Sequence, residues 1–173
     1  MTELTLNNQA MGVYLNDHLA GAKFGSDLAE QLEKENEGTA LGDVMASLAP
    51  QIEKDRELLI DLAERMGTSK NPVKQATTWM AEKASRPKFS GLTSGEPELG
   101  TFMALETLTL GVEGKASLWK ILKEVADVYE PLMSMDFQDL IEKAQSQHDA
   151  LERERVAAGR RALTGEVAGE GGE

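Results

Sequence analysis

The sequence contains no cysteine, and this absence removes several kinds of chemistry from a chain of 173 residues. Disulfides, thiolate catalysis, and zinc or iron–sulfur sites with cysteine ligands are excluded. No run of apolar residues is long enough to cross a bilayer, and the first residues, MTELTLNNQA, lack the basic start and apolar run of a signal peptide. We therefore expect a cytoplasmic protein with no membrane partner.

Positive charge is also scarce, because 18 Lys and Arg stand against 30 Asp and Glu, a formal net charge of -12. Nucleic acids and anionic membranes are bound by clustered cations, so no nucleic-acid partner is expected. Residues 70–88 are the exception, with five cations and one acid, locally +4. We interpret this segment as a solvated connecting helix. The alternative is a homodimer surface that docks on the acidic face of a second copy, with Trp79 and Met80 as apolar anchors.

Aromatic residues make up only 5% of the chain, and the β-branched residues form no alternating runs. Apolar residues instead recur every three or four positions, which predicts helices. The fold class expected is all-α, an up-down-up-down four-helix bundle over residues 1–163, followed by a disordered acidic tail at 164–173. The predicted long helices are 5–35, 39–66, 97–129 and 136–163, and a short helix at 71–87 lies between the second and the third. Asp136 is expected to be the N-cap of the last helix.

Two features of the first helix bear on a site. Gly21 and Gly25 are four residues apart and remove side-chain bulk from one face, which leaves room for another helix to approach closely there. His18 lies on the apolar stripe of the same helix, with Asp17 beside it. Adjacent helix positions diverge by about 100°, so Asp17 is expected at the edge of the stripe.

Each of the four long helices places an ionisable group near its middle. Buried groups of this kind must be paired, protonated or bound to a metal. We predict that His18 meets Asp55 directly or through one water, and that His148 lies within reach of the same polar pocket. The full set of candidates is His18, Asp55, Glu106, Glu113 and His148.

This helix layout resembles the ferritin-like superfamily, over about residues 5–163. That resemblance implies a mid-bundle site for two metals, built from a Glu on each of two helices and a Glu-x-x-His on each of the other two. The sequence departs from the pattern, because Leu58 stands where a His should follow Asp55, and Gln145 replaces the Glu that should precede His148. It is more similar to bacterial ferritin-like proteins in which the di-metal motif is degenerate.

Two classes of function follow. The first is a non-catalytic ferritin-like bundle with a buried His/carboxylate network and an interaction or stress-type accessory role, which the short ligand count favours. The second is a redox or metal-handling protein that binds iron, manganese or zinc through the five candidates, since imidazole and carboxylate suit these metals. Hydrolysis catalysed by Asp55 and Glu113 is a third hypothesis with less support. We therefore assign no catalytic residue.

Overall fold

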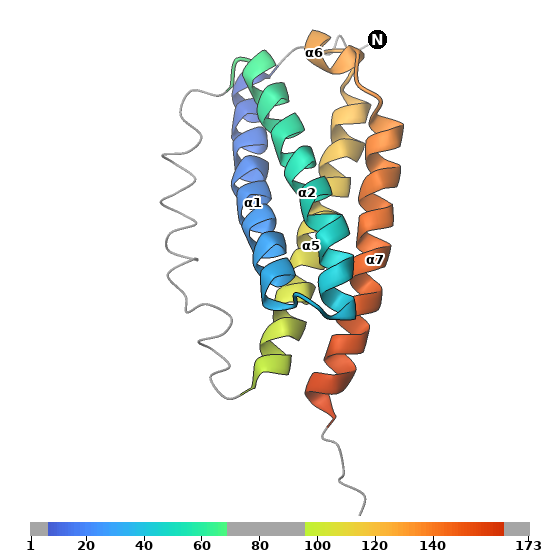
Figure 1. Cartoon of the computed structure of the whole chain (residues 1–173). Helices are drawn as coiled ribbons and strands as arrows, with labels where there is room; N and C mark the ends of the chain where they lie inside the picture. The colour runs from blue at the N-terminus through green and yellow to red at the C-terminus, as the bar shows by residue number, and fades with distance from the viewer. Residues whose placement is uncertain (1–6, 69–95, 165–173) are drawn as a thin grey trace, which may run out of the picture.

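The computed structural model describes residues 7–68 and 96–164, and all regular structure within these ranges is helical (Figure 1). The prediction of an all-α protein is thereby confirmed. The predicted short helix at 71–87, the homodimer surface at 70–88 and the tail from residue 165 lie outside the described residues. The helices are α1 (Asn8–Glu35), α2 (Ala40–Arg65), α5 (Pro97–Glu124), α6 (Glu130–Met133) and α7 (Phe137–Leu163).

Side chains at the helix starts explain why three of the long helices begin where they do. The side-chain oxygens of Asn7, Thr39 and Asp136 accept hydrogen bonds from backbone N–H groups in the first turns of α1, α2 and α7. These bonds satisfy donors that have no partner inside the helix. Asp136 is the N-cap that the sequence predicts. Gly38, with φ of 78°, turns the chain between α1 and α2.

The four long helices form two hairpins, α1 with α2 and α5 with α7, and α1 packs against α5. The backbone N–H of Asn7 donates to the hydroxyl of Tyr129 at 3.0 Å, which places the start of α1 beside the end of α5. A guanidinium N–H of Arg65 donates to the carbonyl of Pro131 at 3.4 Å, which places the end of α2 there too. Figure 1 shows the result, in which α2 and α5 run in the same direction.

The predicted up-down-up-down order is therefore wrong. Residues 69–95 join opposite ends of the bundle, and their 27 residues are enough for the task. A helix of 26 residues such as α2 is about 39 Å long, whereas an extended chain covers about 3.3 Å per residue. Helical periodicity says which face of a helix is buried but not which way the helix runs, so the sequence pattern left the direction open.

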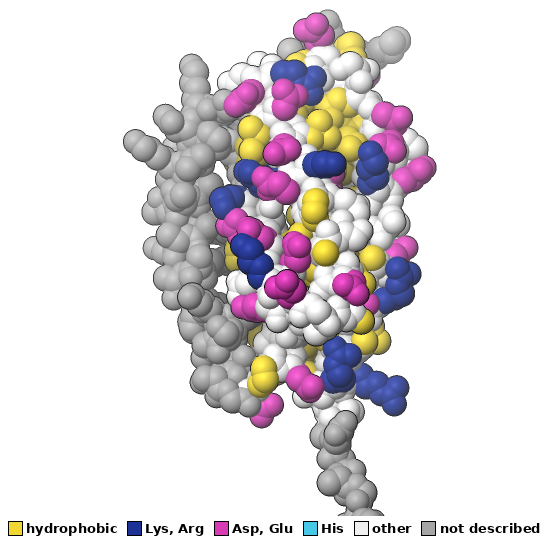
Figure 2. Space-filling model, in the orientation of Figure 1, with side chains coloured by type: hydrophobic (Ala, Val, Ile, Leu, Met, Phe, Trp, Pro, Cys, Tyr) yellow, Lys and Arg dark blue, Asp and Glu magenta, His cyan; other side chains and the backbone are white. Residues whose placement is uncertain are grey.

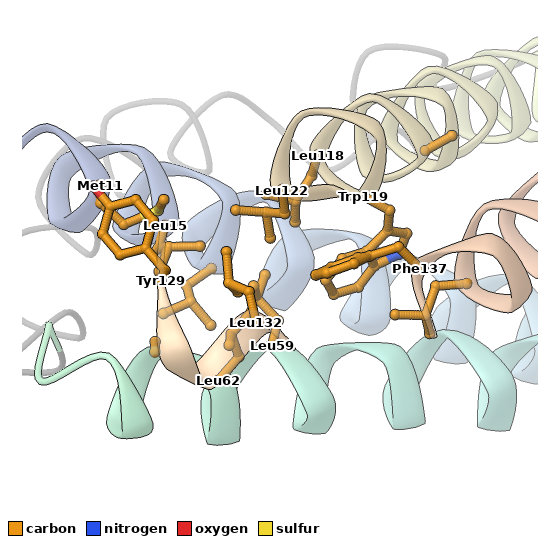
Figure 3. Packing of buried hydrophobic residues seen from close by; sticks show 14 of the residues in the cluster. Met11, Leu15, Leu59, Leu62, Leu118, Trp119, Leu122, Tyr129, Leu132 and Phe137 are labelled. Atoms are coloured by element: carbon orange, nitrogen blue, oxygen red, sulfur yellow. The ribbon is translucent and has the colours of Figure 1, made fainter. Parts of the chain in front are cut away.

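Two apolar clusters fill the interior, one toward each end. Figure 3 shows the first, in which Trp119 and Phe137 lie with ring centroids 6.5 Å apart. The second, toward the other end, is built around Leu32, Met45 and Leu105. Between the clusters the buried positions of α2, α5 and α7 carry polar side chains, and this layer is the centre of the candidate site.

The surface is highly charged. On the face shown in Figure 2, Lys and Arg side chains are interspersed with Asp and Glu and do not gather into one basic patch. Within residues 7–68 and 96–164, no helix is both long and apolar enough to span a membrane.

Candidate functional site

The polar layer consists of Asp55 on α2, Lys115 on α5 and Gln147 on α7. The ammonium of Lys115 donates to Oδ2 of Asp55 and to Oε1 of Gln147. Nε2 of Gln147 donates to the same oxygen of Asp55 at 3.1 Å, which closes the triangle. The side chains of Lys115 and Asp55 are each 14% exposed, and Gln147 is 2% exposed. Three helices are thus tied together by one set of hydrogen bonds inside the bundle.

Charge balance allows these polar side chains to be buried. Burial lowers the pKa of Lys115 because the ammonium loses hydration, and the carboxylate of Asp55 opposes that effect. The lysine and the aspartate neutralise one another, and the amide of Gln147 contacts both. An ammonium carries three N–H donors. Two of them bind Asp55 and Gln147, and no other described side chain accepts the third.

The sequence analysis missed Lys115 and Gln147, although helical spacing contains a signal for both. Lys115 is three residues after Val112 and four before Trp119, and both of these are buried. In the same way Gln147 lies three residues after Ala144 and four before Leu151. These spacings place both polar side chains on the apolar stripes.

Of the two contacts predicted between His18 and Asp55, the direct one is not formed, and the one through a water molecule stays a prediction. Both residues line the same cavity, but no direct hydrogen bond joins them among the described residues, and Asp55 binds Lys115 and Gln147 instead. The physical reason is that an ammonium compensates a buried carboxylate better than a neutral imidazole. His18 packs edge-on against Tyr14, with ring centroids 4.7 Å apart. Burial lowers the pKa of His18, and the negative charge of Asp17 partly opposes this by raising it. Asp17 itself is exposed at the edge of the stripe, as expected.

The other three metal candidates each lie beside a charged residue other than Asp55. His148 contacts Asp149 at 3.4 Å, and its side chain is 26% exposed. The structure pairs Glu106 with Arg155 at 3.1 Å, and it places Glu113 4.0 Å from Lys120. In the part of the chain that the structure describes, no three His, Asp or Glu side chains are grouped so that they could hold a metal ion.

A cavity of about 280 Å³ adjoins the polar layer, between α1, α2 and α5. Two glycines on α1, Gly21 and Gly25, lie across it from Gly111 and Gly114 on α5. A Cβ atom added at Gly21, Gly111 or Gly114 would meet no other atom within 4 Å, and one at Gly25 would meet only Leu108, at 3.9 Å. The close helix approach that these glycines would permit is not formed at Gly21, which faces open space, while Gly25 is near Leu108 of α5.

The walls of the cavity are mainly apolar, and its ionisable groups come from all three helices. Leu28, Ile52 and Trp119 are among the apolar residues, and Gly21 and Gly111 are exposed at its solvent side. The ionisable residues that line it are Asp17, His18, Asp55, Arg56 and Lys115.

Arg56 is held in place by a second polar group on α2. Its guanidinium donates to both carboxylate oxygens of Glu53, at 2.8 and 2.5 Å. The hydroxyl of Ser26 on α1 donates to Glu53 as well, at 2.5 Å. The hydrogen bond from Arg56 is the largest cause that lowers the pKa of Glu53, to about 2. This group connects α1 with α2 along one edge of the cavity.

The arrangement joins a charge-balanced, hydrogen-bonded interior to an open apolar cavity. No family model matches the chain, and neither the curated proteins nor the solved structures compared with it gave a match.

Proposed function

We propose that the protein is a non-catalytic, ferritin-like helical bundle that has an accessory role through interaction or binding and performs no reaction of its own. One observation carries the proposal. At mid-height, between the two apolar clusters, the ammonium of Lys115 is the cation that neutralises Asp55. In a metal-handling bundle this is the level at which carboxylate and imidazole ligands surround metal ions.

The order of the helices supports the ferritin-like part of the proposal. Two antiparallel hairpins whose inner helices, α2 and α5, run parallel need one long crossover connection (Figure 1). Ferritin-like folds have one such crossover, whereas simple up-down-up-down bundles have only short loops.

Electrostatics supports the non-catalytic part. A divalent metal bound to Asp55 would lie close to the ammonium of Lys115. Two unit charges 4 Å apart repel by about 4 kcal/mol at the effective dielectric constant of about 20 that suits such sites, and a divalent ion doubles this. The carboxylate is already compensated, so the layer has little to gain from a metal. Its role is then to hold α2, α5 and α7 in register, as buried polar groups do in some bundles.

The test is to measure metal content in protein purified without chelator, followed by calorimetric titration with Fe²⁺, Mn²⁺ and Zn²⁺. We expect far less than one metal per chain and no rise in melting temperature on addition of any of the three. Stoichiometric binding that is lost in both His18→Ala and His148→Ala, and kept in the exposed control Glu57→Gln, would establish the metal-binding alternative instead.

A further inference from the structure

The packing of the bundle does not require this cavity to be open. Four glycines from α1 and α5 line it, and glycine is a poor helix former, so each lowers the stability of its own helix. Three of the four would accept a Cβ without touching any atom. The space therefore does not relieve a steric conflict, and larger residues would fill it.

The polar end of the cavity is defined by Lys115. Its ammonium lines the cavity, and two of its three N–H groups bind Asp55 and Gln147. The remaining N–H is a donor at the wall of an otherwise largely apolar space. An oxygen atom of a bound molecule would give it an acceptor.

The surrounding charges select an uncharged molecule. Asp55 neutralises Lys115, and Glu53 neutralises Arg56. Asp17 is a further negative group at the rim, and His18 offers a half-buried imidazole whose pKa is lowered by burial. An anion would add a second negative charge to a balanced site, and a cation would compete with Lys115 for Asp55.

We propose that this cavity binds an uncharged, mostly apolar small molecule with one hydrogen-bond-accepting oxygen, to which Lys115 donates. A cavity of about 150 Å³ holds benzene, so one of about 280 Å³ holds about eleven non-hydrogen atoms. The ligand enters between α1 and α5, where Gly21 and Gly111 are exposed. This site is independent of the proposed function, because it requires no metal and no particular helix order.

The experiment uses the full chain and the probe 2-naphthol, an aromatic molecule of this size with one hydroxyl. Binding is measured by calorimetry and by shifts of backbone amide signals in α1 and α5. We expect saturable binding that Gly114→Leu weakens at least about tenfold, because its side chain fills the cavity. Ser117→Leu places the same leucine side chain on the exposed face of α5, so it is the control and should bind within about twofold of wild type.

The oxygen contact is tested with naphthalene, which has the same rings and no acceptor. One hydrogen bond corresponds to about 3- to 10-fold in affinity, so naphthalene should bind more weakly than 2-naphthol by that factor. In the double variant Asp55→Leu/Lys115→Met, which removes both charges together, the two probes should bind equally.

Two results would overturn the proposal. The first is no binding of 2-naphthol by wild type up to its solubility limit, and the second is undiminished binding by Gly114→Leu. These results do not bear on metal content, so the proposed function is tested separately by the metal measurements.

Discussion

At the scale of single residues, the interior of this protein depends on which cation meets Asp55. A neutral imidazole at His18 would have left the carboxylate charge uncompensated at neutral pH. Lys115 brings a full positive charge on a flexible stem, and Gln147 contributes a donor and an acceptor. All three are anchored on different helices, so the layer fixes how α2, α5 and α7 are aligned.

The first prediction concerns this ion pair. Lys115→Met should lower the free energy of unfolding by about 2–4 kcal/mol, because it leaves Asp55 buried without a counter-charge. Asp55→Leu should cost a similar amount, and the double change should cost clearly less than the sum of the two. Urea denaturation measures all three. Simple additivity would show that the pair is not coupled. The exposed pair Lys23–Asp27 provides the control, since Lys23→Met should be close to neutral.

The second prediction concerns Glu53 and acid. The pKa of its carboxyl is lowered from 4.5 to about 2, so the folded state binds a proton less readily than the unfolded state. The stabilisation is present above pH 4.5 and is lost as the pH falls toward 2. Such a shift corresponds to about 3 kcal/mol for a fully buried group, and solvent screening reduces this to about 1 kcal/mol at 37% exposure.

The measurement is the free energy of unfolding of wild type and Glu53→Gln between pH 7 and pH 2.5. The advantage of wild type should shrink across the acid range, while Glu57→Gln, an exposed change on the same helix, should follow wild type throughout. A difference between wild type and Glu53→Gln that stays constant with pH would rule out this linkage.

At the scale of the helices, glycine is required for steric reasons at one position and not at another. Near the start of α2, a Cβ at Gly42 would lie 2.0 Å from the carbonyl oxygen of Asn36, so only glycine fits beneath the turn that joins α1 to α2. In the middle of α5, Gly111 faces open space, and no steric reason calls for glycine there.

The third prediction follows from this contrast. Gly42→Ala should lower the free energy of unfolding by at least about 2 kcal/mol, since backbone must move to make room. Gly111→Ala should raise it by about 0.5–1 kcal/mol, because alanine is the better helix former and meets no neighbour. Thermal unfolding of both variants beside wild type checks the signs. Equal effects at the two positions would contradict the packing described for the α1–α2 turn.

At the scale of the whole molecule, the direction of α5 decides which segments meet. Ala40 at the start of α2 and Glu98 at the start of α5 line one surface depression, together with residues near the end of α7. In an up-down-up-down bundle the start of α5 would lie at the opposite end from the start of α2. Each of the long helices still has antiparallel neighbours, because α1 packs on α5 and α2 on α7.

The fourth prediction tests this arrangement. The chain has no cysteine, so pairs can be introduced without background. A short bis-maleimide should cross-link Ala40→Cys with Glu98→Cys within one chain. It should fail with the control pair Ala40→Cys and Lys120→Cys, since Lys120 lies about 33 Å farther along α5. Mass spectrometry of the digested protein identifies the link. The reverse pattern would restore the up-down-up-down order.

Much of the architecture at the level of helices could be predicted from the sequence. The three- and four-residue spacing of apolar side chains predicted four long helices, and their observed bounds agree to within a few residues at most ends. Asp136 was predicted as an N-cap and is one. Asp55 was predicted to be a buried ionisable group near the middle of its helix, and its side chain is only 14% exposed. These features depend on local hydrogen bonds and on periodicity, which a single helix carries within itself.

Only the tertiary structure decided the direction of α5, the partners of Asp55 and the cavity. A helical pattern is the same whichever way the helix runs. The direction of α5 is therefore seen only in how the helices pack. The candidates for a partner of Asp55 were the polar groups of three other helices, and the choice of Lys115 over His18 depended on which side chain reaches it with a compensating charge. Gly21 and Gly25 permit either close packing or an open space, and the glycines opposite them on α5 leave it open.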